Sequence, residues 1–251
     1  MNVKILASGS AGNCIHIQSG STSILVDVGI PKTKIEKRLI EAGIDPTQLD
    51  YIFITHAHAD HTKGLPLANK YRIPVYAAHS EWNNIQSVDE NLMQIIDSPI
   101  SFDYGCGGGG FDVFPFSTHH DAYDPLGYAF MFHSGGKISI CLDTGKVDSE
   151  MLGTMSDSDI YIIEANHEPD LLELSKRPDS VKARILSDIG HLSNEQAAEA
   201  LLKLVKGRGE RIYLTHLSGE ANSPALAEMT VRQALRRKGL QVGIHYHLEV
   251  C

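Results

Sequence analysis

The stretch ITHAHADHTKG, from Ile54 to Gly64, places three histidines and an aspartate within six positions. It follows an apolar run, Tyr51–Thr55, that is typical of a short β-strand. A single histidine is more often a surface or core residue, but a solvated loop has no reason to gather four metal-binding side chains. The cluster therefore predicts a metal site at the end of a strand.

The spacing within the cluster predicts two metal ions. His56 and His58, two positions apart in an extended segment, point the same way and are expected to bind one ion. The adjacent Asp60 and His61 are expected to face a second ion. Two ions about 3.5–4 Å apart form a hydrolytic centre, and imidazole with carboxylate suits zinc, manganese or iron.

Other apolar runs also end at residues of ligand type. Ligands bind beyond the carboxyl ends of strands in layered α/β folds, so neighbouring strands would bring these residues to one edge. The runs and the residues that follow them are Phe114–Phe116 with His119 and His120, Ile138–Leu142 with Asp143, Ile160–Ile163 with Glu164, and Ile212–Thr215 with His216.

Composition limits the classes of protein to consider. The chain has 251 residues, 42% of them hydrophobic, and a formal net charge of -9, so we expect a single domain over residues 1–251 without a broad basic face. No apolar run is long enough to span a bilayer. The four cysteines, Cys14, Cys106, Cys141 and Cys251, have no spacing typical of disulfides or zinc knuckles, and we expect a cytoplasmic protein. Oligomeric state is left open.

Three further segments have clear local signals. A helix is expected from Pro31 to before Gly43. Ser193 and Gln196 form a capping box before a second helix, and Ser223–Pro224 opens a third. The glycine-rich Tyr104–Gly110 lacks the Lys-Ser/Thr of a phosphate-binding loop, so we expect a hairpin loop there.

The motif THAHADH, Thr55–His61, resembles the His-x-His-x-Asp-His signature of the metallo-β-lactamase fold superfamily. The resemblance covers essentially the whole chain and implies an α/β fold, the αββα sandwich, in which helices flank two mixed sheets. It also implies a set of metal ligands. These are His56, His58, Asp60, His61, His120, Asp143 and His216. His119 competes with His120, but HDAYDPLGY resembles the family pattern from His120 onward.

Two other stretches separate the branches of this superfamily. An exported β-lactamase is not expected, because Asp143 stands where many of those enzymes have a cysteine. SDIGHLSNEQA and YIIEANHE are similar to motifs of ribonuclease Z and related phosphodiesterases, which implies that His191 protonates the leaving oxygen and Glu164 orients it. With ASGSAGNC, Ala7–Cys14, the chain looks most like the WalJ-type (YycJ-like) 5′-3′ exonuclease group.

That resemblance implies a metal-dependent phosphodiesterase, a 5′-3′ exonuclease on single-stranded DNA or RNA with a role in DNA repair or replication. Two divalent ions, Zn²⁺ or Mn²⁺ with iron as a third option, would supply a hydroxide that Asp60 orients. Ser193, Asn194 and Arg177 are expected to contact phosphate, and the alternative for Ser193 and Asn194 is that they brace the site. A small-molecule hydrolase acting on a cyclic phosphodiester, lactone or thioester is the alternative function, and a non-catalytic binding module is a third.

Overall fold

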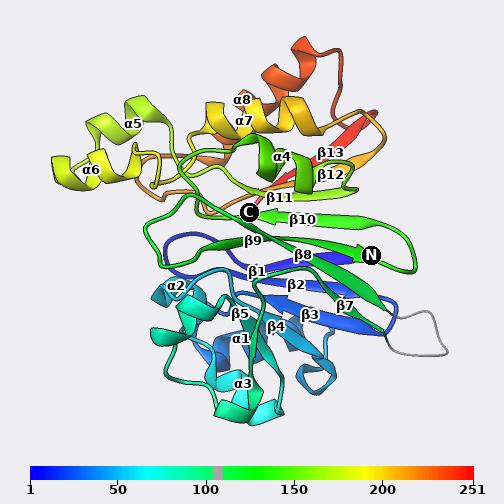
Figure 1. The fold of residues 1–251 in the computed structure, drawn as a ribbon. Helices are drawn as coiled ribbons and strands as arrows, with labels where there is room; N and C mark the ends of the chain where they lie inside the picture. The colour runs from blue at the N-terminus through cyan, green and yellow to red at the C-terminus, as the bar shows by residue number, and fades with distance from the viewer. Residues whose placement is uncertain (104–109) are drawn as a thin grey trace. The chain divides into compact units, whose positions relative to one another are not determined.

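The computed structural model describes residues 1–103 and 110–251 (Figure 1). The loop expected at Tyr104–Gly110 therefore lies outside the described residues except for Gly110. The contacts divide the chain into two compact units. Unit 1 comprises Met1–Pro115, Ala122–Leu126 and Phe130–Gly136, and unit 2 comprises Phe116–Asp121, Gly127–Ala129 and Lys137–Cys251.

The first sheet belongs to unit 1. Its order is β1-β2-β3-β4-β5-β6, antiparallel from β1 to β3 and parallel from β3 to β6. The strands are β1 (Asn2–Ala7), β2 (Cys14–Ser19), β3 (Thr22–Val26), β4 (Tyr51–Phe53), β5 (Val75–Ala77) and β6 (Met93–Ile95). The mixed pairing matters for the site, because β3 and β4 run in parallel and so end side by side.

Helices of unit 1 cover one face of this sheet (Figure 1). They are α1 (Lys32–Glu41), α2 (Ala59–Thr62) and α3 (Pro66–Tyr71), with short 3-10 turns η1 (Pro46–Gln48), η2 (His79–Asn83) and η3 (Glu90–Leu92). Ile35 and Leu39 of α1 are buried against Leu25 and Ile52 in one apolar cluster. The period of these apolar positions is that of an amphipathic helix, which is why the helix expected after Pro31 forms here.

An aromatic cluster fills the opposite side of the first sheet within unit 1. Phe53 stacks on Tyr76 with ring centroids 5.0 Å apart, and Phe102 stacks on Phe111 at 4.6 Å. Phe130 meets Phe53 edge to face at 5.2 Å. Such pairs add about 0.5–1.5 kcal/mol each beyond the burial of their area. The cluster therefore fixes β4, whose end leads into the histidine-rich motif.

The second sheet has seven strands in the order β13-β12-β11-β10-β9-β8-β7. They are β7 (Ile100–Phe102), β8 (Phe111–Ser117), β9 (Leu126–Phe132), β10 (Lys137–Cys141), β11 (Ile160–Glu164), β12 (Glu210–Thr215) and β13 (Tyr246–Val250). Strands β10 to β13 are parallel, and β7 pairs with β8 in the antiparallel sense. The carboxyl ends of β10, β11 and β12 consequently share one edge of unit 2.

Three helices of unit 2 pack against β10–β13, namely α4 (Ser149–Met155), α7 (Asn194–Leu204) and α8 (Pro224–Arg237). Two short helices, α5 (Pro169–Leu174) and α6 (Asp179–Ile185), lie to the side of this sheet in a separate apolar cluster (Figure 1). The predicted capping box is present, since Ser193 accepts from the Gln196 amide and the Gln196 side chain accepts from the Ser193 amide. Cys141 is fully buried in the apolar core that α4, α7 and α8 share with the sheet, as its place in an apolar run predicted.

Most predicted elements are confirmed, and the differences lie at their ends. The strand expected at Tyr51–Thr55 ends at Phe53, because Ile54 and Thr55 already leave the ladder toward the motif. The strand seen weakly at Phe114–Phe116 is longer and spans β8.

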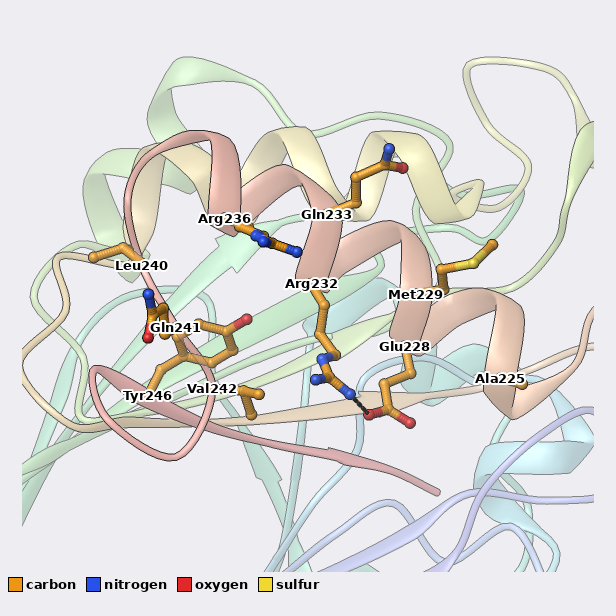
Figure 2. A pocket seen from close by; sticks show the side chains of 10 residues that line it. All are labelled: Ala225, Glu228, Met229, Arg232, Gln233, Arg236, Leu240, Gln241, Val242 and Tyr246. Carbon is orange, nitrogen blue, oxygen red and sulfur yellow. Dashed lines mark hydrogen bonds and ion pairs between the residues drawn. The ribbon is translucent and has the colours of Figure 1, made fainter.

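A hollow of about 730 Å³ lies beside α8 (Figure 2). Arg232 and Glu228 form an ion pair at 2.9 Å on its wall, and the buried Tyr246 lines it. The other lining residues are Ala225, Met229, Gln233, Arg236, Leu240, Gln241 and Val242. No residue predicted for the metal or catalytic site lines this hollow.

Helix α8 offers a matched test of the core of unit 2. Leu235 is fully buried, whereas Met229 on the same helix is 58% exposed. Leu235→Ala should lower the free energy of unfolding by about 2–5 kcal/mol, because it leaves a cavity. Met229→Ala should change it by less than about 0.5 kcal/mol. Urea unfolding of both variants measures the difference, and equal losses would contradict this account of the packing.

Candidate metal centre

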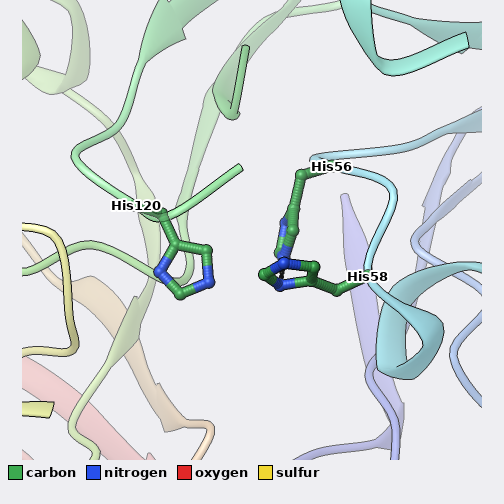
Figure 3. Close-up of side chains that lie close together, drawn as sticks. All are labelled: His56, His58 and His120. Atoms are coloured by element: carbon green, nitrogen blue, oxygen red, sulfur yellow. Dashed lines mark hydrogen bonds between the residues drawn. The ribbon is translucent and has the colours of Figure 1, made fainter. Parts of the chain in front are cut away.

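The histidine-rich motif of unit 1 starts two residues beyond β4. His56 Nε2 and His58 Nδ1 lie 3.0 Å apart and face each other (Figure 3). His56 is buried and His58 is partly buried. Zinc–imidazole bonds are about 2.0–2.1 Å long, so two ring nitrogens at this separation can share one cation. The pair that the sequence assigned to one metal is therefore brought together.

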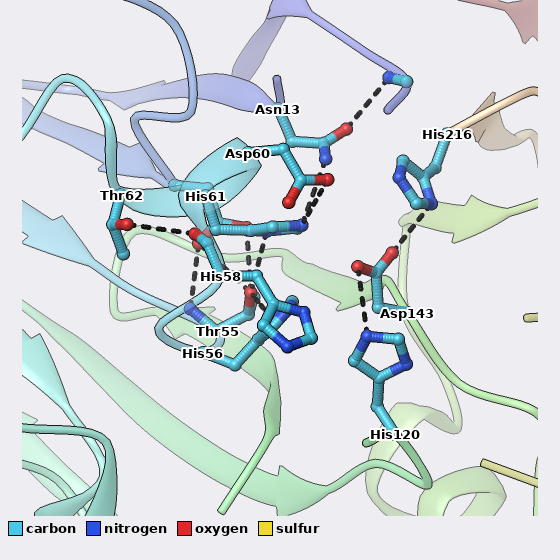
Figure 4. Close-up of polar contacts among 12 residues, drawn as sticks. Asn13, Thr55, His56, His58, Asp60, His61, Thr62, His120, Asp143 and His216 are labelled. Atoms are coloured by element: carbon cyan, nitrogen blue, oxygen red, sulfur yellow. Dashed lines mark hydrogen bonds and ion pairs between the residues drawn. The ribbon is translucent and has the colours of Figure 1, made fainter. Parts of the chain in front are cut away.

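His61 is held by a buried carboxylate that the motif itself does not contain. Its Nδ1 lies 2.7 Å from Asp27 Oδ2. Its Nε2 lies 3.6 Å from Asp60 Oδ2 (Figure 4). Asp27 also accepts from the amide of Thr55 at 2.9 Å. When Nδ1 donates to a carboxylate, Nε2 is left with the lone pair that a metal requires. Asp27 therefore orients His61 so that Nε2 and Asp60 form one ligand pair.

Close backbone contacts fix the loop that carries Asp60. Asn13 donates its backbone amide to the carbonyl of Asp60 at 2.8 Å, and its side-chain nitrogen lies 3.2 Å from His61 Nε2. A Cβ on Gly29 would lie 1.6 Å from the Asp60 carbonyl oxygen, so only glycine fits there. Glu81, fully buried, accepts from the amide of Ala57 at 2.7 Å. The motif is thus braced from three separate segments of unit 1.

A second cluster lies at the strand ends of unit 2, centred on Glu164. This carboxylate is fully buried at the end of β11. Its Oε1 accepts from His191 Nδ1 at 2.6 Å and from His216 Nδ1 at 2.7 Å, and its Oε2 accepts from the amides of Thr144 and Leu192 at 3.2 Å. Both imidazoles are therefore fixed through Nδ1, so their Nε2 atoms are not used by Glu164.

Charges in this cluster stabilise one another. Burial would raise the pKa of Glu164, but the charge of His191 and hydrogen bonds from His191 and His216 outweigh it and place the pKa well below the usual range. Burial would lower the pKa of His191, but the charge and hydrogen bond of Glu164 raise it. The pair is consequently a carboxylate beside an imidazole that retains its proton, which is the state needed in a general acid.

Asp143 lies in the same cluster. One oxygen is 2.7 Å from His216 Nδ1, and Figure 4 shows both side chains directed toward each other. Ligand atoms of Asp143, Glu164, His191 and His216 all lie within 4.8 Å of one another. Asp143 and His216 have φ angles of 43° and 56°, an uncommon conformation for residues other than glycine that is concentrated at functional sites. Carboxylate with imidazole is a donor set that fits a divalent cation.

The choice between His119 and His120 has a structural basis in unit 2. His120 is buried, donates Nδ1 to the Gly190 carbonyl at 3.1 Å and directs Nε2 toward Asp143 at 3.8 Å. Burial lowers the pKa of His120, which favours the neutral ring that metals bind. His119 instead pairs with Asp148 at 2.7 Å, the residue that caps α4. These contacts support His120 as the ligand.

The three residues expected to contact substrate have different surroundings. The Ser193 hydroxyl caps α7. Asn194 is fully buried and donates to Glu168 and Asn222 at 3.2 and 3.0 Å. Both sets of contacts fit the bracing alternative. Arg177 is 26% exposed in its side chain, so it alone of the three retains an accessible charged group.

Two functional residues were missed from the sequence, Asp27 and Glu81. Asp27 could have been found, because a charged residue directly follows the apolar β3, and Asp143 likewise lies two residues beyond β10. β3 ends at Val26, and Asp27 leaves the strand with a φ of 57°. Glu81 lies in a 3-10 turn with no apolar period around it, so no local signal marked it.

Comparison with known proteins shows the family to which the chain belongs. A family model described as a beta-lactamase superfamily domain matches residues 22–217. Exodeoxyribonuclease YycJ of Bacillus anthracis is 36% identical over 97% of this chain and 92% of its own length. Exodeoxyribonuclease WalJ of Streptococcus pneumoniae is 38% identical over 96% of this chain and 91% of its own length. The chain belongs to the metallo-β-lactamase superfamily.

The superfamily assignment confirms the predicted fold class, the α/β sandwich with two mixed sheets flanked by helices. The metallo-β-lactamase fold protein YhfI of Bacillus subtilis has the same fold. Its TM-score is 0.71 at 16% identity, over 99% of this chain and 95% of that chain. Among residues 1–103 and 110–251, no helix has the length and apolar character needed to cross a bilayer.

Asp27 gives a direct test of how His61 is oriented. Both carboxylate oxygens accept hydrogen bonds, so Asp27→Asn would turn an NH₂ group toward a donor. We expect metal affinity to fall about 10–100-fold. Asp45→Asn, the same change at an exposed cap of a 3-10 turn, should have no effect. Equilibrium titration with Zn²⁺ or Mn²⁺ measures this, and unchanged affinity in the Asp27 variant would refute the role.

Proposed function

We propose that the protein is a metal-dependent exonuclease that hydrolyses single-stranded DNA from the 5′ end. The observation that carries the proposal is the contact at 2.6 Å between the buried Glu164 and the partly buried His191, beside Asp143 and His216. A proton donor held by a carboxylate is suited to a leaving alkoxide, which is a poor leaving group. The printed names of the relatives YycJ and WalJ, both exodeoxyribonucleases, support DNA as substrate.

Two divalent cations, Zn²⁺ or Mn²⁺ with iron as a third option, are part of this proposal. The ligands would be His56, His58, Asp60, His61, His120, Asp143 and His216. When bound, the cations would supply an activated hydroxide and positive charge for an anionic substrate. The support is the orientation of three of these imidazoles within their own units, where a carboxylate or carbonyl holds Nδ1 of His61, His120 and His216.

The protein's own residues have distinct roles in hydrolysis. Asp60 would help to orient the attacking hydroxide toward phosphorus. His191 would donate its Nε2 proton to the departing oxygen, because Nδ1 is already engaged with Glu164. Glu164 keeps that imidazole protonated and aimed. Arg177 would contact a phosphate of the strand, and Ser193 and Asn194 would brace α7 and the loop before it.

A small-molecule hydrolase is the other function considered from the sequence. The relatives that match nearly the whole chain do not favour it, since their names give a DNA substrate. The acidic net charge of -9 does not argue for it either, because bound cations add positive charge at the site itself.

His191→Ala should reduce hydrolysis of single-stranded DNA about 10²–10⁴-fold while the protein retains its metal ions, because only the proton donor is lost. His247→Ala, an exposed histidine on β13, is the matched control and should leave the rate unchanged. Rates are measured on strands labelled at either end, next to lactoylglutathione and a cyclic nucleotide. Metal content of both variants is measured in parallel.

Three results would contradict the proposed function. They are hydrolysis of only the thioester or the cyclic nucleotide, unchanged DNA hydrolysis in His191→Ala, and DNA hydrolysis that persists after the metals are removed. Shortening from the 3′ end would keep the nuclease and overturn its polarity.

A further inference from the structure

One polar region of unit 2 contains neither a proposed metal ligand nor the proton donor. It consists of the loop after β11, residues 165–168, and the part of the loop after β12 that follows His216, residues 217–222. The amide of Ser218 donates to the carbonyl of Asn166 at 2.8 Å, and the amide of Glu168 donates to that of Ala221 at 2.8 Å. The first loop also bonds to the segment that follows His191, since Asn166 donates its amide to Leu192 at 2.9 Å. The region therefore adjoins the proton donor.

His167 is the unexplained residue of this region. It is only 1% exposed, and neither ring nitrogen has a hydrogen-bond partner among the residues that the structure describes. Burial lowers its pKa to about 4, and the charges of Glu164, His191 and Arg177 also act on it. A buried polar group without a partner needs an explanation, such as a role in binding a ligand.

Arg177 supplies positive charge near the same residue. Its Nη2 donates to Ser218 Oγ at 3.1 Å, and its Nε donates to Glu220 at 3.2 Å. Ser218 is itself buried and lies two residues beyond His216, so the loop fixes the guanidinium relative to the catalytic edge of unit 2. A guanidinium has five N–H donors, and these contacts use two of them. The remaining donors suit the bidentate recognition of a phosphate.

We infer that Arg177 and His167 form a subsite for the terminal 5′-phosphate of the DNA strand. The inference rests on the proposed function and names the part of the substrate that this region binds. In hydrolysis at the first linkage, water oxygen bonds to phosphorus while the P–O3′ bond breaks and leaves its electron pair on O3′. His191 gives O3′ a proton, and the proton released by water restores His191. The leaving group is the terminal nucleotide.

This chemistry determines which phosphate Arg177 and His167 meet. Groups beside the proton donor face the leaving nucleotide, and the anionic group of that nucleotide is its own 5′-phosphate. Arg177 supplies charge, and the neutral His167 ring supplies one N–H donor. Each cut produces a shortened strand with a new 5′-phosphate, so the same subsite would recognise every successive end. A strand that begins with a 5′-hydroxyl lacks this contact only for its first cut.

The test compares 5′-phosphorylated and 5′-hydroxyl strands of one sequence with the metal-loaded, full-length protein. The wild-type kcat/KM should be about tenfold or more higher on the phosphorylated strand, the size expected for a charged hydrogen bond. Nucleotide release from the hydroxyl strand should show a lag that ends after the first cut. Arg177→Gln should raise KM on the phosphorylated strand and bring the two strands within about twofold of each other.

His167→Phe should also reduce the preference for phosphate, and Arg177→Lys should retain part of it. Because Arg177 is partly exposed, its two variants remain informative if His167→Phe does not fold. Arg236→Gln on α8, an exposed arginine far along the chain from these loops, should keep the wild-type preference.

Equal wild-type rates on both strands without a lag would overturn the subsite, and so would an equal loss on both strands in Arg177→Gln. These failures differ from failure of the proposed function, in which the wild-type protein with bound metal would hydrolyse neither strand.

Discussion

The arrangement at the strand ends of unit 2 depends on one buried carboxylate shared by two imidazoles. Glu164 Oε1 lies 2.6 Å from His191 and 2.7 Å from His216, and both bonds are made to Nδ1. A buried carboxylate is stable only with such partners, because desolvation of an unpaired charge costs several kcal/mol. The same bonds leave Nε2 of each ring for the role proposed for it, which is proton donation for His191 and metal binding for His216. One interaction thus joins the stability of the core to the proposed chemistry.

Strained backbone at the strand ends has a related role. Asp27, Asp143 and His216 each follow an apolar strand and each adopt a positive φ, between 43° and 57°. The conformation turns the chain sharply. The polar side chain therefore projects from the edge of the sheet, and does not point to one of its faces as the next residue of a strand would. Residues other than glycine adopt it at a cost of about 1–3 kcal/mol. The buried hydrogen bonds of these side chains offset that cost.

Sequence reasoning found the ligand types because the apolar strands are short and end at charged residues. It found α7 and α8 because Ser193 and Ser223 are strong caps. It missed Asp27 because the sequence does not mark the end of β3 at Val26. It missed Glu81 because the partners of that carboxylate, the amides of Ala57 and Asp124, are distant in sequence. It also could not separate bracing from substrate contact at Asn194, since only burial reveals that its side chain is already engaged.

The central claim of the proposed function is that its seven ligand residues bind a pair of divalent cations. Diffraction from crystals grown with Mn²⁺, recorded near the manganese absorption edge, tests it most directly. The account predicts two anomalous peaks about 3.5–4 Å apart beside the proposed ligands. Absence of any peak beside Asp143 and His216, in protein that still degrades DNA, would contradict it.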